Sequence, residues 1–293
     1  MRVLQELFRY EQPASTGESL HLRGFELFVC AWVAHFVWQW SPEIARLGAV
    51  VLPLGVANWV DVTFMFNELA PRINAALITV GCLLGLSRFA RPGYALAMLG
   101  FHLQYAARYS QGEISHGSNL IGTALFTMAL GALLERDALR ARRFSFGFSV
   151  LLTGIGYSSA ALCKLVATGP LWVRGEHLVL WIHERSIDGF GKNGEIALNS
   201  LQELLLAQPL LATLTLTFGL LAEACGILMV RPKLRPYISG ILMLMHVGIW
   251  MSMDILFEVN IWFLVVLGLP WGPWFERLSG RVQRGRMPAP QHT

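Results

Sequence analysis

The sequence predicts an all-α integral membrane protein, a polytopic bundle of about eight transmembrane helices. Of the 293 residues, 54% are hydrophobic and only 14% are charged, whereas soluble domains carry about 25% charged residues. The mean hydropathy is +0.50. Ten tryptophans are present, and tryptophan gathers at membrane–water interfaces. A soluble α-protein would need helices with a continuous polar face, which most segments lack.

Eight apolar runs approach the roughly 20 residues that a membrane helix needs. Residues 1–23 precede them and are too polar for a cleavable signal, so we expect a cytoplasmic N-terminal segment. The apolar stretch 48–66 is interrupted by Pro53, Asn58 and Asp61, and we interpret it as a re-entrant or interfacial segment. The eight runs are 24–41, 73–88, 92–108, 118–135, 145–168, 208–230, 236–256 and 259–275.

The basic residues predict the orientation. With eight spans and the N-terminus inside, sixteen of the 23 lysines and arginines fall in cytoplasmic segments and six fall in outer loops. This distribution follows the positive-inside rule, whereas counting 48–66 as a crossing would place most basic loops outside. We therefore expect both termini in the cytoplasm and a single transmembrane domain over residues 1–276. The basic tail 277–293 is predicted to be cytoplasmic and disordered.

One outer segment is long. Residues 169–207 form the predicted extracytoplasmic loop, which contains His177, His183 and a glycine-rich run at 189–194. Within it, the amphipathic piece 197–207 is expected to lie along the outer interface as a helix.

Several function classes are disfavoured by what the sequence lacks. The four cysteines lie in apolar runs without a C-x-x-C pair, which disfavours thiol–disulfide chemistry. Neither H-x-x-x-H nor H-E-x-x-H occurs, so no metal is expected. The basic residues are explained by membrane topology, and we expect no nucleic-acid partner.

Lys164 is the sharpest candidate for chemistry, because an ionisable group within a span is costly and often functional. Gly156, Ala160 and Lys164 share one helix face at a spacing of four, and small residues on such a face predict close helix packing. A desolvated lysine favours its neutral amine, which acts as a general base. Lys164 also lies about four residues from the outer end of its run, within reach of the interface by snorkelling. Both interpretations stay open at this point.

Other ionisable residues also lie in or near the spans. His246, Trp250 and Asp254 recur every four residues, which fits either a polar cavity wall or helix–helix hydrogen bonding. Glu223 lies between Gly219 and Gly226. It is expected either to be neutral or to pair with His246, Lys164 or another buried base, as a structural tie or as part of a proton relay. His116 and Asn119 stand at the outer mouth of the fourth span. For His35, Asp61 and His102, satisfied polar groups are the default interpretation.

The order of these motifs resembles a known family. Residues 157–165 and 172–175 resemble the Y-x-x-A-G-x-x-K-L…W-x-x-G stretch of the vitamin K-dependent γ-glutamyl carboxylase family, which includes short bacterial homologues known as the horizontally transferred transmembrane domain (HTTM). Residues 220–226 resemble its acidic small-residue helix, 245–249 its H-x-G-I-type helix and 118–120 its N-L element. The similarity covers roughly residues 70–270.

The resemblance implies a reduced-quinone substrate of the vitamin K hydroquinone or menaquinol type. In that family a membrane lysine deprotonates the hydroquinone, reaction with oxygen gives a strong base that removes a glutamyl γ-proton, and carbon dioxide adds to the carbanion. Lys164 falls on that lysine. The charge-derived topology places it on the outer side, where the family's chemistry occurs.

The leading hypothesis is therefore a carboxylase-like membrane enzyme with lyase and epoxidase chemistry, using a reduced quinone and oxygen, with carbon dioxide as a candidate co-substrate. It would lie in a bacterial cytoplasmic (inner) membrane with its active side facing the periplasm. Its expected partners are membrane lipid, the quinone and a protein or peptide substrate on the extracytoplasmic side. Lys164 and His116 are the catalytic candidates, and the residues expected to bind the quinone are Tyr157, Asn119, Trp172, Glu223, His246, Trp250 and Asp254.

Two alternatives from other classes remain. A non-catalytic membrane subunit could bind quinone or lipid, or scaffold a partner protein. A small-molecule transporter is less well supported, because no pair of broken helices occurs in matching halves.

Overall fold

The computed structural model describes residues 7–8, 13–47, 52, 54–112 and 116–284. Every regular element among these residues is helical, which confirms the all-α class. The chain forms two compact units, residues 1–149 with 270–293 and residues 150–269. The long helix α6 (Ala138–Thr168) begins in the first unit and ends in the second.

Among the described residues, five helical segments are long and apolar enough to cross a membrane, as expected of an integral membrane protein. They overlap five of the eight predicted runs. Helices α3 (Ala70–Gly85) and α11 (Glu258–Gly268) are apolar but have 16 and 11 residues, and α4 (Ala90–Tyr109) carries several polar side chains. The count of eight spans stays a prediction. The five segments are Thr16–Leu47, His116–Leu134, Ala138–Val173, Pro209–Val230 and Arg235–Met253.

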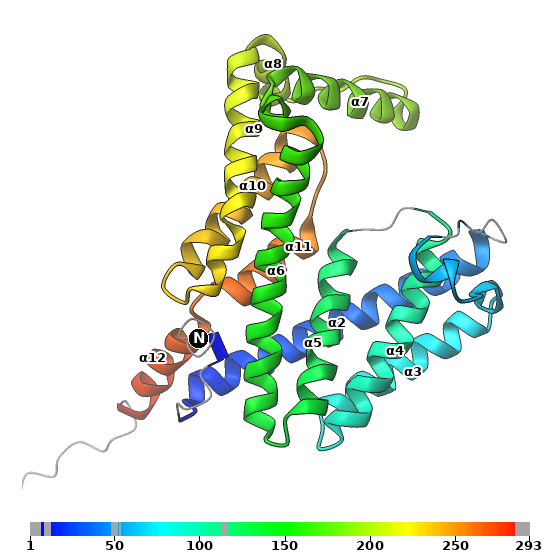
Figure 1. Ribbon diagram of the computed structural model, residues 1–293, viewed down its shortest axis with the longest axis vertical. Helices are drawn as coiled ribbons and strands as arrows, with labels where there is room; N and C mark the ends of the chain where they lie inside the picture. Colours follow the sequence, from blue (N-terminus) through cyan, green and yellow to red (C-terminus); the bar gives the residue numbers. More distant parts are fainter. Residues whose placement is uncertain (1–6, 9–12, 48–51, 53, 113–115, 285–293) are drawn as a thin grey trace, which may run out of the picture. The chain divides into compact units, whose positions relative to one another are not determined.

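The first unit is built on α2 (Thr16–Leu47), which packs against α3, α4, α5 (His116–Leu134) and α12 (Trp271–Arg284). Helix α2 begins earlier than predicted because the Ser15 hydroxyl caps it, accepting a hydrogen bond from the Glu18 backbone N–H at 3.1 Å. Helices α3 and α4 lie side by side (Figure 1). A Cβ built on Gly81 would lie 2.8 Å from the backbone nitrogen of Ala97, so only glycine permits this approach.

The segment predicted to be re-entrant or interfacial contains only two short 3₁₀ helices among its described residues, Gly55–Asn58 and Thr63–Met65. Residues 48–51 and 53 lie outside the described residues. Trp59 is 90% exposed. Thr63 donates two hydrogen bonds to the Asp61 carboxylate, from its side-chain hydroxyl at 2.6 Å and from its backbone N–H at 2.8 Å. The hydroxyl has the larger effect, and both bonds lower the pKa of Asp61. The re-entrant or interfacial placement stays a prediction.

The predicted run 259–275 is divided in the structure. Helix α11 ends at Gly268, and Leu269 is extended because the residue before a proline is disfavoured in a helix. A separate helix, α12, follows Pro270 and continues to Arg284. The predicted disorder of the tail is therefore wrong for residues 277–284, while 285–293 lie outside the described residues. Helix α12 is held to α2 by the Gly17 backbone N–H, which donates to Glu276 Oε2 at 2.7 Å.

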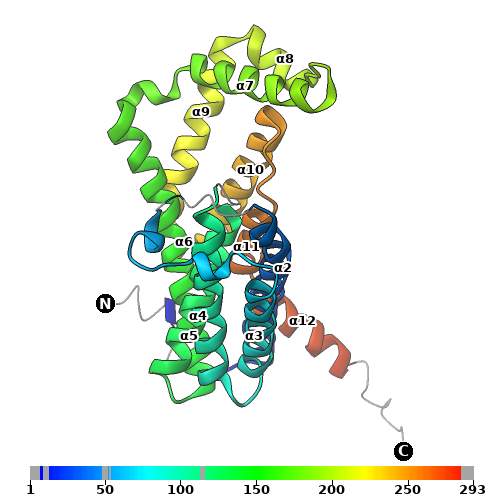
Figure 2. The same ribbon diagram turned by 90° about the vertical axis from the view of Figure 1, so that its right-hand side faces the viewer.

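The second unit contains two helices where the sequence predicted mainly a loop. The predicted loop 169–207 forms η3 (Gly169–Val173), α7 (Gly175–Asn193) and α8 (Ser200–Ala207). Helices α7 and α8 both pack at one end of α9 (Pro209–Ala224) (Figure 2). Their apolar core consists of Leu178, Ile182, Leu205, Ala212 and Leu216. The predicted amphipathic piece corresponds to α8, which the Asn199 capping box starts.

Candidate functional site

Lys164 on α6 is paired inside the second unit. Its ammonium group donates to both carboxylate oxygens of Glu223, at 2.5 Å each. The Lys164 side chain is 29% exposed and the Glu223 side chain 10%. Lys164 was one of the partners that the sequence suggested for Glu223. The structure brings the two together from segments 59 residues apart.

Trp172 completes the surroundings of the amine. The Lys164 Nζ lies 4.7 Å from the Trp172 ring centroid, within cation–π range. Trp172 lies in η3, whose first residue, Gly169, has a positive φ of +67°. Helix α7 supports it, because the Trp181 ring packs 5.8 Å away and His177 Nδ1 lies 3.0 Å from the Trp172 carbonyl oxygen. An aromatic face is therefore held beside the amine.

The position of Glu223 depends on a change of helix type. Helix α9 ends at Ala224 and continues as a 3₁₀ helix, η4 (Cys225–Val230). Ser158 of α6 bridges this change, since its hydroxyl donates to the Ala224 carbonyl at 3.0 Å and accepts from the Ile227 N–H at 2.9 Å. Ser158 was not among the predicted site residues. A serine within a membrane helix commonly bonds across helices, and that signal could have identified it.

Close packing at the site involves a different glycine from the one predicted. A Cβ built on Gly154 would lie 2.9 Å from the Gly226 carbonyl oxygen, whereas a Cβ on Gly156 would meet nothing within 4 Å. The prediction of a packed stripe is therefore wrong for Gly156. Gly154 and Gly226 instead bring α6 and η4 together, which places Lys164 near the end of α9.

A second polar pair involves another residue of α6, Tyr157. The Tyr157 hydroxyl and His246 Nε2 of α10 (Arg235–Met253) are 2.7 Å apart, and both side chains are buried. The Phe257 ring packs 5.1 Å from the His246 ring. Asn260 of α11 interacts with the Tyr157 hydroxyl. His246 Nδ1 and Asn260 Oδ1 are buried without a hydrogen-bond partner among the described residues, so both retain bonding capacity.

The two pairs form one site. Tyr157 and Lys164 are seven residues apart on α6, about two helical turns, and so share a face. Lys164 is close enough to His246, and Glu223 to Tyr157, for electrostatic interaction. We call this group the Lys164 cluster, and it consists of Tyr157, Lys164, Trp172, Glu223 and His246.

Trp250 and Asp254 are exposed, unlike His246 on the same helix. Helix α10 ends at Met253, and Asp254 follows in a left-handed conformation with φ 53°. Trp250 is 46% exposed and Asp254 is exposed, whereas His246 is 4% exposed. The spacing of four therefore places one buried and two exposed side chains along α10.

His116 and Asn119 belong to the first unit, at the beginning of α5. The Asn119 side-chain oxygen accepts a hydrogen bond from the Tyr105 hydroxyl of α4. Within the described part of the chain, no group of three His, Cys, Asp or Glu side chains is arranged to hold a metal ion.

Comparison with known proteins found no matching family model, no matching curated protein and no matching solved structure. What the Lys164 cluster does is therefore inferred from its residues and their geometry.

Proposed function

We propose that this chain is a membrane enzyme that removes a proton from a reduced quinone at the Lys164 cluster, in chemistry of the vitamin K-dependent carboxylase type. The observation that carries the proposal is the ion pair between the Lys164 amine and both oxygens of Glu223. Lysine, unlike arginine, is able to give up its proton at a partly buried site. Such a pair therefore holds a potential base.

The proton has a nearby acceptor. As an ion pair, Lys164 and Glu223 have no net charge, and transfer of one proton from the amine to the carboxylate also leaves no net charge. The neutral amine that results can accept a proton from a bound hydroxyl group. Glu223 thus activates the base, and the Tyr157–His246 pair offers a second proton-exchanging group beside it.

The surroundings of the amine suit a flat, weakly acidic ring. Trp172 presents an aromatic face 4.7 Å from the Lys164 amine, and a quinol ring can stack on such a face. The unpartnered His246 Nδ1 and Asn260 Oδ1 suit the polar groups of a ring substrate. A bound quinol would supply the acidic hydroxyl and the reducing electrons, while the protein supplies the base and the positioning.

The remaining parts of the proposal rest on the family resemblance and on charge distribution. Oxygen would oxidise the deprotonated quinol, and carbon dioxide would add to a protein or peptide acceptor on the extracytoplasmic side. His116 and Asn119 stay candidates through the family resemblance alone, and Trp250 and Asp254 would contribute from the end of α10. Eight spans with both termini inside would place the site toward the periplasm of a bacterial inner membrane, since most basic residues then lie in the cytoplasm.

Quinol turnover in purified protein tests the proposal. Menaquinol oxidation and oxygen uptake are measured in nanodiscs for the wild type, Lys164→Ala and Glu223→Gln. We expect Lys164→Ala to lower the rate by about 100-fold or more, as for loss of a general base, and Glu223→Gln to lower it less. Wild-type turnover by a folded Lys164→Ala protein would overturn the proposal.

Arg174→Ala is the matched control for this experiment. Arg174 belongs to the same unit and pairs with Glu176 at 2.9 Å, but both side chains are more than half exposed. The variant removes one cation and breaks one ion pair outside the Lys164 cluster. We expect its turnover to equal that of the wild type.

A second candidate is a non-catalytic subunit that binds quinone or lipid, or scaffolds a partner protein. The observation in its favour is the tie between α6 and the α9–η4 segment, where Ser158 and the Lys164–Glu223 pair join the same two elements. A wild-type protein without quinol turnover that copurifies with a stoichiometric partner would support this role.

A further inference from the structure

The first unit contains a cavity of about 500 Å³ that the proposed quinol chemistry does not use. Its walls come from α2, from the turn between α3 and α4, from the end of α5 and from the start of α6. All of its lining residues belong to the first unit.

Positive charge predominates in the lining. Arg88, Arg91, Arg136 and Arg142 face two glutamates, Glu26 and Glu135, so the lining carries two more positive than negative charges. Among the described residues, the first three arginines form no ion pair with a carboxylate. Arg91 instead donates to the carbonyl oxygens of Ala132 and Glu135, at 2.9 and 3.3 Å. These guanidinium groups have charge available for an anion.

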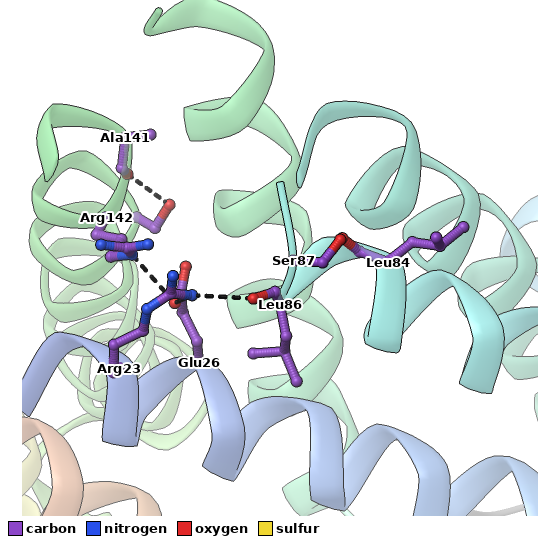
Figure 3. Close-up of polar contacts among 8 residues, drawn as sticks. Arg23, Glu26, Leu84, Leu86, Ser87, Ala141 and Arg142 are labelled. Atoms are coloured by element: carbon purple, nitrogen blue, oxygen red, sulfur yellow. Dashed lines mark hydrogen bonds and ion pairs between the residues drawn. The ribbon is translucent and has the colours of Figure 1, made fainter. Parts of the chain in front are cut away.

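Glu26 holds two arginines in place. Arg23 Nη1 and Arg142 Nε both donate to its Oε2 atom, at 2.8 and 3.2 Å (Figure 3). Arg23 Nη1 also donates to the Leu86 carbonyl oxygen at 3.3 Å. Glu26 is 5% exposed, and its single charge already faces two cations. The two terminal nitrogens of Arg142 have no acceptor among the described residues, so Glu26 positions this arginine while leaving donors for a ligand.

Tyr94 gives an independent sign of a ligand. It lines the cavity, its side chain is 2% exposed, and its hydroxyl makes no hydrogen bond with the described residues. The Glu26 carboxylate interacts with the hydroxyl but does not reach normal hydrogen-bond geometry. Buried polar groups in proteins are nearly always paired. An acceptor within the cavity would pair this one.

The backbone and the apolar side chains define the ligand further. Helices α4 and α6 both begin at the cavity, at Ala90 and Ala138, and helix N-termini favour anions. Phe89, Pro92 and Met128 also line it. Arginine is well suited to the planar, multidentate recognition of phosphate. We propose that the cavity binds the phosphate group of an amphiphilic anion, either an anionic phospholipid or a free phosphate ester.

Binding is measured by native mass spectrometry and by the shift in thermal unfolding midpoint. One arm adds phosphatidylglycerol to phosphatidylcholine nanodiscs, and the other adds soluble glycerol 3-phosphate to nanodiscs of phosphatidylcholine alone. A response to phosphatidylglycerol alone identifies a lipid site, and a response to glycerol 3-phosphate identifies a site for a soluble ester. No response in either arm overturns the proposal.

Matched arginine variants locate the binding. Arg136→Gln and Arg88→Gln each remove one cavity charge, and we expect each to weaken binding about tenfold. Arg140→Gln removes an exposed arginine from the first turn of α6 outside the cavity, and binding should stay as in the wild type. Equal affinities for all three variants would show non-specific attraction and contradict the site.

Tyr94→Phe tests the hydroxyl separately. The change keeps the shape of the side chain and removes a hydroxyl that makes no hydrogen bond of normal geometry with the described residues. We expect the ligand-free protein to unfold at the wild-type temperature while ligand binding weakens. Unchanged binding would exclude the Tyr94 hydroxyl and contradict this part of the site.

Discussion

Two buried glutamates, one in each unit, have different cationic partners. Glu26 is 5% exposed and accepts from two arginines, whereas Glu223 is 8% exposed and accepts from one lysine. Arginine stays charged in proteins, whereas a lysine amine is chemically able to lose its proton. The first arrangement is therefore a permanent charge network beside a cavity, whereas the second exchanges a proton under the function proposed above. On that proposal, the identity of the cation, more than the burial of the acid, separates the structural ion pair from the reactive one.

The largest expected difference between the units is in the loss of stability when Glu26 or Glu223 is replaced by alanine. Glu26→Ala leaves two arginines without their shared carboxylate and should lower the free energy of unfolding by about 3 to 5 kcal/mol. Glu223→Ala should cost about 1 to 3 kcal/mol, because it leaves one partly exposed cation without its partner rather than two. Reversible unfolding in mixed detergent measures both. Equal costs would mean that the number of cations left unpaired does not set the loss of stability.

The glycines of α6 give the next largest effect. Gly154→Ala forces a methyl group against the η4 backbone, and we expect it to destabilise the protein by about 1 to 3 kcal/mol. Gly156→Ala, two residues away, enters open space and should stabilise the helix by about 0.5 to 1 kcal/mol. The same unfolding measurement compares them. A harmless Gly154→Ala would mean that α6 and η4 are not closely packed at the site.

The smallest effect concerns two buried tyrosines. Tyr157→Phe leaves His246 Nε2 without its partner, which should cost about 1 kcal/mol and also reduce quinol turnover. Tyr94→Phe removes an unpartnered hydroxyl and should change stability by less than about 0.5 kcal/mol. Thermal unfolding of both variants provides the check. A larger loss for Tyr94→Phe than for Tyr157→Phe would reverse the contrast between the units.

Composition and hydropathy were sufficient to predict the all-α membrane class, because apolar runs and scarce charge follow from the lipid environment. The sequence also suggested Lys164 as a partner for Glu223. It did not predict the helices α7 and α8 in full, or the break before α12, because these depend on local caps and on Pro270. The role of Ser158 depends on the change from α9 to η4, which hydropathy does not reveal.

The arginine-lined cavity shows another limit of sequence reasoning. Arg88, Arg91, Arg136 and Arg142 were interpreted only as markers of the cytoplasmic side. They come from two places in the sequence, the turn from α3 into α4 and the turn from α5 into α6, which are separated by α4 and α5. Their convergence depends on how these helices pack. Spacing along the chain therefore could not predict that they share one cavity.

The Lys164–Glu223 pair either transfers a proton during catalysis or only joins two helices, and Lys164→Arg separates these roles. Arginine keeps the positive charge and the donors to Glu223, but it does not release its proton. Menaquinol oxidation is measured for this variant in nanodiscs. A thermal unfolding temperature equal to that of the wild type shows that the variant is folded. We predict that turnover falls as far as in Lys164→Ala. Turnover near the wild-type rate would contradict a proton-transferring lysine and leave the pair as a structural tie.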